Sequence, residues 1–71
     1  MMLVHVDDHD AVDDLIAHYA RSGFVATAVG AGFVEILRPD SSDFEREQRD
    51  IALHLRLWEI VNPGRGVRFV D

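Results

Sequence analysis

The chain has 71 residues, 48% of them hydrophobic and 28% charged, so we expect one small globular domain over residues 1–71 rather than a disordered segment. The formal net charge of −6 argues against a nucleic-acid binder and against attraction to an anionic membrane. The absence of cysteine excludes disulfides, Cys-ligated metals and thiol catalysis, and it fits the reducing cytoplasm that we expect. No stretch approaches the ~20 apolar residues of a transmembrane helix.

The N-terminal half predicts a strand, a helix and a second strand. Residues 3–6 are apolar and mostly β-branched and end at an acidic turn, as a short strand does. Apolar residues then recur at helical spacing over 10–22, beside aspartates that suit a helix N-terminus, and Gly23 closes this helix. Residues 24–29 carry no charge and alternate between large and small side chains, which is typical of a strand.

The C-terminal half predicts a hairpin partner, a long helix and a last strand. Gly-Ala-Gly at 30–32 precedes a strand-like run over 33–38. Ser42 and Glu45 form a capping-box pattern for a helix over 43–61, and residues 67–70 predict the final strand. The order β-α-β-β-α-β predicts an α+β, ferredoxin-like fold, a four-stranded antiparallel sheet with two helices on one face and the first and third strands in the centre.

In length and in the order of its strands and helices, the whole chain resembles the small ferredoxin-like regulatory modules, which include ACT domains and heavy-metal-associated domains. The heavy-metal-associated domains carry a Cys-x-x-Cys pair after their first strand, where this chain has Val-Asp-Asp-His-Asp at 6–10. A copper-chaperone function is therefore not expected. The resemblance to ACT-like domains implies sensing of a small ligand near the start of the first helix and at a dimer interface. It identifies no residue of this chain as a ligand contact.

The stretch His-Val-Asp-Asp-His-Asp at 5–10 contains the candidate metal ligands. His5 and Asp7 share one face of a strand and His9 follows, so these side chains could converge on a divalent cation. Together with Glu35, they are also the acid–base candidates of an enzyme whose pocket would lie between two subunits. Because aspartates favour a helix N-terminus, we expect a cap here and no metal, cofactor or catalytic residue.

The second predicted helix carries two apolar stripes. The stripe expected to cover the sheet comprises Phe44, Gln48, Ile51, Ala52, Leu55 and Trp58. The stripe on the opposite side comprises Leu53, Leu57, Ile60 and Val61. Either the first helix and the loop at 63–66 cover this second stripe, or a partner does. The pattern offers no reason to pair His18 with His54, which lie on different helices.

Strand alternation points one set of side chains at the helices, namely Val4, Val6, Val34, Ile36, Val67 and Phe69. It turns another set of hydrophobic side chains away from the helices, namely Leu3, Phe33, Leu37 and Val70. Burying this face against a second copy would supply stability that a short chain without disulfides lacks. We therefore predict a non-enzymatic interaction or regulatory module that acts as a homodimer or as an accessory subunit of a larger protein. A small-ligand or metal-sensing domain and a small enzyme with its pocket at a dimer interface are the alternatives.

Overall fold

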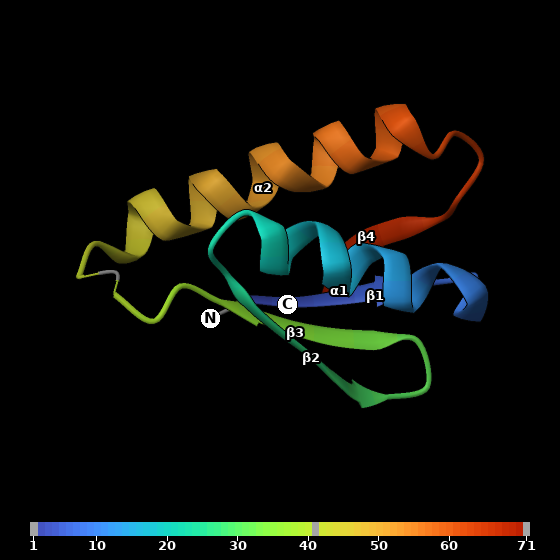
Figure 1. The fold of residues 1–71 in the computed structure, drawn as a ribbon, viewed down its shortest axis with the longest axis horizontal. Helices are drawn as coiled ribbons and strands as arrows, with labels where there is room; N and C mark the ends of the chain where they lie inside the picture. The colour runs from blue at the N-terminus through green and yellow to red at the C-terminus, as the bar shows by residue number, and fades with distance from the viewer. Residues whose placement is uncertain (1, 41, 71) are drawn as a thin grey trace.

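The computed structural model describes residues 2–40 and 42–70, and in it two helices cover one face of a four-stranded antiparallel sheet (Figure 1). The strands are β1 (Met2–Val6), β2 (Val25–Gly30), β3 (Phe33–Leu37) and β4 (Val67–Val70). The helices are α1 (Val12–Arg21) and α2 (Phe44–Val61), and a short 3-10 turn, η1 (His9–Ala11), precedes α1. The strand order is β2-β3-β1-β4, which confirms that the first and third strands are central.

Aspartates begin both helical segments. Asp8 accepts a hydrogen bond from the Asp10 backbone N–H at 2.9 Å and caps η1. Asp43 accepts from the Arg46 N–H at 3.1 Å and caps α2. The predicted capping box that begins at Ser42 is therefore wrong by one residue, because the carboxylate at 43 already occupies the free amide groups of the first turn.

The end of α1 follows the prediction. Gly23 has a φ of 88°, the left-handed conformation that commonly closes a helix and that glycine adopts without strain. The chain then returns as β2, at the edge of the sheet beside β3. No helix within the described ranges is both long and apolar enough to cross a membrane.

The core lies between the sheet and the helices. Its largest fully buried side chains come from β1, β3, α1 and α2 and are Val4, Val6, Val34, Ile36, Leu15, Tyr19, Ile51 and Trp58. Hydrogen bonds from two of these buried side chains join the helices. The Tyr19 hydroxyl donates to the Ile51 carbonyl at 2.7 Å, and the Trp58 indole N–H donates to an Asp14 carboxylate oxygen at 2.9 Å.

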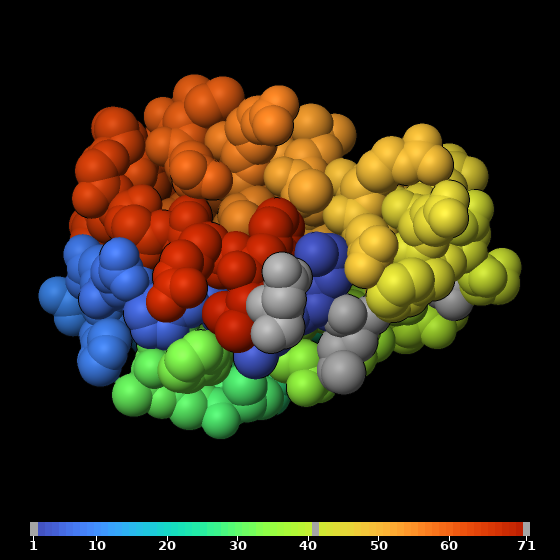
Figure 2. Space-filling view, turned by 180° about the vertical axis from the view of Figure 1, so that it is seen from behind, coloured from blue at the N-terminus to red at the C-terminus, as the bar shows by residue number. Residues whose placement is uncertain are grey.

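The stripe by which α2 covers the sheet differs in part from the predicted one. Ile51, Leu55 and Trp58 are buried as expected, but Phe44 is 58% exposed and Ala52 is also exposed. Glu47 lies on the same side of α2 as these three core residues and is also buried. The first turn of α2 projects past the end of α1 (Figure 1), and Phe44 lies in that turn, so it has less of the molecule to pack against. From behind (Figure 2), α2 in orange lies above β4 in red.

Candidate functional site

The acidic loop after β1 caps η1 and contacts the loop before β4. His5 Nδ1 lies 3.1 Å from Asp7 Oδ1, without the alignment of a hydrogen bond, and the His5 ring meets Phe33 edge-on at 4.7 Å between centroids. Asp8 forms an ion pair with Arg65 in addition to its capping bond. His9 is exposed, and no group of three or more His, Cys, Asp or Glu side chains within 2–40 and 42–70 is arranged to hold a metal. The structure thus brings His5 and Asp7 together and does not gather His9 with them.

The same turn fastens β1 to the loop before β4. The Asp7 backbone N–H donates to the Gly66 carbonyl at 2.8 Å. A Cβ atom at position 66 would lie 2.3 Å from Asp7 Oδ2, so only glycine fits against this carboxylate without a rearrangement. Asp7 and Asp8 therefore connect the end of β1 to the loop that leads into β4.

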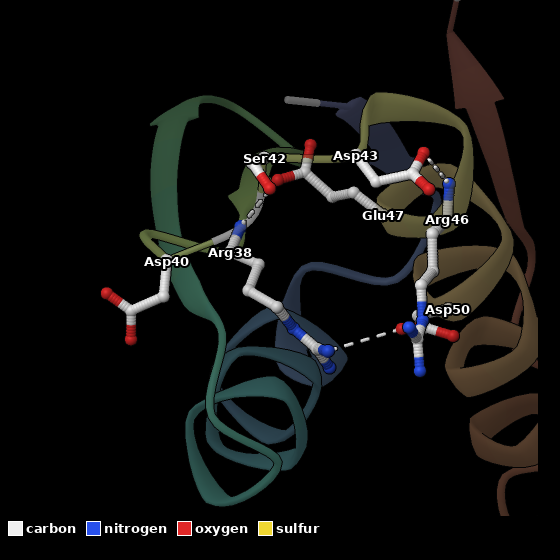
Figure 3. Close-up of a pocket in the computed structure, with 7 residues that line it drawn as sticks. All are labelled: Arg38, Asp40, Ser42, Asp43, Arg46, Glu47 and Asp50. Atoms are coloured by element: carbon white, nitrogen blue, oxygen red, sulfur yellow. Dashed lines mark hydrogen bonds and ion pairs between the residues drawn. The ribbon is translucent and has the colours of Figure 1, made fainter.

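A polar hollow of about 340 Å³ opens at the start of α2 (Figure 3). It is lined by Arg38, Asp40, Ser42, Asp43, Arg46, Glu47 and Asp50. The Arg38 guanidinium donates to Asp50 Oδ2 at 3.2 Å and stands 4.4 Å from the centre of the Phe24 ring. Within this hollow, the opposite charges of Arg38 and Asp50 are thus paired with each other.

Glu47 is the buried member of this hollow. Its Oε2 accepts a hydrogen bond from the Arg38 backbone N–H at 3.1 Å. Hydrogen bonds to the carboxylate, that one included, lower the pKa of Glu47 below its usual value, against the opposing effect of burial. The side chain is therefore an ionised acceptor that ties the end of β3 to α2. Sequence reasoning missed it, although Glu47 precedes Ile51, Leu55 and Trp58 at helical spacing.

His18 of α1 and His54 of α2 are paired, contrary to expectation. His18 Nε2 lies 3.3 Å from His54 Nδ1, and both rings pack near Tyr19. Burial lowers the pKa of His18, and the neighbouring His54 and Arg21 lower it further, while Asp14 opposes them. The pairing depends on how the two helices lie against each other, which the sequence of either helix does not specify.

The outer stripe of α2 is uncovered. Leu53, Leu57 and Ile60 are 55%, 43% and 69% exposed, and Val61 is also exposed. Neither α1 nor the loop at 63–66 covers these side chains, so that alternative is wrong. A hollow of about 220 Å³ on this side of α2 is lined by Arg49, Ala52, Leu53 and Arg56.

The face of the sheet turned away from the helices carries the other predicted apolar set. Leu3, Phe33, Leu37 and Val70 are half-buried there, while their strand neighbours Val4, Val6, Val34 and Ile36 are fully buried on the helix side. The register places Leu3 opposite Val70, and residues opposite each other in a ladder share a face. It also places Val25, which is 44% exposed, opposite Leu37. Val25 was not predicted to lie on this face, because the side chains of this edge strand were not assigned to either face of the sheet.

No protein-family model, curated protein or solved structure matches this chain. Its function therefore has to be inferred from its own surfaces.

Proposed function

We propose that the chain is a non-enzymatic interaction module that forms a homodimer through the open face of its sheet. The observation that carries this proposal is the hydrophobic set on that face, which comprises Leu3, Val25, Phe33, Leu37 and Val70. The two helices lie on the other side of the sheet (Figure 1) and do not cover it. Gathered apolar side chains on an open surface of a small protein are typical of an interaction site.

The charges on the same face support a second copy as the occupant. Glu35 pairs with Leu3 in the β1–β3 register, and Arg68 pairs with His5 in the β1–β4 register. Glu35 and Arg68 therefore lie on opposite sides of β1, and neither forms an ion pair within residues 2–40 and 42–70. A two-fold axis that runs along β1 brings Glu35 of one protomer toward Arg68 of the other, and in that arrangement the face is self-complementary in charge as well as apolar.

We also propose that the fold is ferredoxin-like. The element order and the strand order β2-β3-β1-β4 support this assignment. The topology is shared by proteins of many functions, so it does not choose among them. The cytoplasmic location expected from the composition stays a prediction.

Sedimentation velocity at tens of micromolar tests the dimer. We expect wild type to sediment with twice the chain mass of 8.0 kDa, and Phe33→Glu with Leu37→Glu to sediment as a monomer. Leu53→Ser with Ile60→Ser is the matched control, because it removes exposed hydrophobic side chains from α2 instead, and it should remain a dimer. Circular dichroism checks that each variant is folded. A monomeric wild type, or an unchanged mass in the Phe33 and Leu37 variant, contradicts the proposal.

A further inference from the structure

The side of α2 that faces away from the core carries hydrophobic and cationic side chains in one line. Positions 49, 53, 56 and 60 are spaced by four, three and four residues, so they fall on a single stripe of the helix. Leu53 and Ile60 are exposed there, and Arg49 and Arg56 lie beside them. This is the spacing with which a helix presents a seam to another helix.

The arginines of this stripe specify the charge of an occupant. All seven basic residues of the chain are arginines, against thirteen Asp and Glu, yet Arg49 and Arg56 share the exposed side of one helix. Among the described residues, Arg38 and Arg65 have carboxylate partners, whereas Arg49 and Arg56 form no ion pair. A guanidinium group beside an apolar surface is suited to bind a carboxylate with two parallel hydrogen bonds.

The shape of the surface suits an inserted side chain. The hollow of about 220 Å³ is lined by the small side chain of Ala52 and by the larger ones of Arg49, Leu53 and Arg56. A second hollow, of about 540 Å³, shares Arg49 and Ala52 with the first and is also lined by Met2, Glu45, Gln48 and Phe69. The second hollow thus lies between α2 and the strands β1 and β4. Small residues between larger ones form the holes into which side chains of a neighbouring helix pack.

We infer that this face of α2 binds an amphipathic helix of another protein, one whose apolar stripe is flanked by Asp or Glu. The inference rests on the proposed interaction function and names the chemistry of its partner. A dimer through the sheet leaves this face free, because α2 covers the opposite side of the sheet (Figure 1). An anionic membrane is the poorer occupant, since a lipid surface has no fixed side chains to fill the hollows.

Fluorescence anisotropy with two labelled, helix-stabilised synthetic peptides tests the inference. Both peptides carry leucines at alternating four- and three-residue spacing, flanked by glutamates in one and by lysines in the other. We expect wild type to bind the Glu peptide, and Arg49→Glu with Arg56→Glu to bind it about tenfold more weakly and to prefer the Lys peptide. Arg21→Glu is the control for an Arg-to-Glu exchange away from this face, because it makes one such exchange at an exposed position of α1, and it should leave binding unchanged.

Several outcomes contradict the inference. One is equal binding of both peptides, or of neither, by wild type. Another is binding of the Glu peptide that the Arg49 and Arg56 variant retains in full. Binding to phosphatidylserine vesicles that the same variant abolishes assigns the face to a membrane, and loss of the dimer in Leu53→Ser with Ile60→Ser assigns it to a second copy. A monomeric wild type that binds the Glu peptide overturns the sheet dimer and leaves this inference intact.

Discussion

The indole N–H of Trp58 donates to the carboxylate of Asp14 across 2.9 Å, and the ring that carries this N–H is 1% exposed. One side chain of α2 thus fills the core and binds α1 through a charge-assisted hydrogen bond. The central packing of the two helices and the sheet depends on this residue more than on any exposed position of α2.

Trp58→Ala should lower the free energy of unfolding by about 3–5 kcal/mol, because the lost transfer energy and the remaining cavity add. Trp58→Phe retains much of the ring but removes the donor to Asp14, so its loss should be smaller. Leu57→Ser with Ile60→Ser should have a lesser effect than Trp58→Ala, since both side chains are exposed. Urea denaturation measures all three. A Trp58→Ala protein as stable as wild type would show that α2 packs on another face.

Glu47→Ala should lower the free energy of unfolding by about 1–3 kcal/mol, because it removes the acceptor of the Arg38 backbone N–H. Glu47→Gln keeps a carbonyl oxygen at the same place and should lose less. Glu45→Ala, an exposed change two residues earlier on α2, is the control and should lie close to wild type. Equal stabilities of the Ala variants at 45 and 47 would contradict the role assigned to Glu47.

Stability should fall as the pH is lowered from 7.5 toward 5.5. The pKa of His18 in the folded chain lies below its usual 6.5, so the unfolded chain binds more protons in the window beneath that value. Protonation therefore favours unfolding there, and the full contribution of His18 is present only above pH 6.5. Denaturation midpoints at the two pH values, compared between wild type and His18→Gln, measure the effect. The variant should lose less stability on acidification, and an equal loss would exclude His18 as the responsible group.

Gly32→Ala should destabilise the fold more than Gly64→Ala. Both glycines have positive φ, 77° and 85°, so alanine at either position is strained by about 1–2 kcal/mol. A Cβ at position 32 would also lie 2.7 Å from the Val6 carbonyl oxygen, whereas one at 64 meets nothing within 4 Å. The Val6 N–H donates to the Gly32 carbonyl at 2.7 Å, so that clash would disturb the pairing of β1 with the hairpin. Thermal melts of both variants measure the difference, and a Gly64→Ala protein that melts lower would contradict it.

Features set by local pattern were predictable from the sequence. Alternation in β1 and β3 placed Val4, Val6, Val34 and Ile36 on the helix side, and the structure confirms it. The positive φ at Gly23 and the order of the elements were likewise expected. Such features depend on a side-chain period of two or on the turn chemistry of a few neighbouring residues.

Features that depend on the packing of distant elements were not predictable. The contact of His18 with His54 and the bond from Tyr19 to the Ile51 carbonyl arise from the way α1 lies against α2. The burial of Glu47 depends on the path of the chain after β3, which brings the Arg38 N–H to its carboxylate. A helical wheel assigns faces only coarsely, and for this reason it placed Ala52 on the buried side of α2. It also cannot show that Phe44 lies in a turn that projects past α1.

The sheet-face dimer is tested most directly by isotope-filtered NMR on a mixture of labelled and unlabelled chains. Contacts between protomers are then observed separately from those within one chain. We expect intermolecular contacts among the side chains of Leu3, Phe33, Leu37 and Val70. Intermolecular contacts confined to Leu53, Leu57 and Ile60, or none at concentrations of hundreds of micromolar, would contradict the dimer through the open face of the sheet.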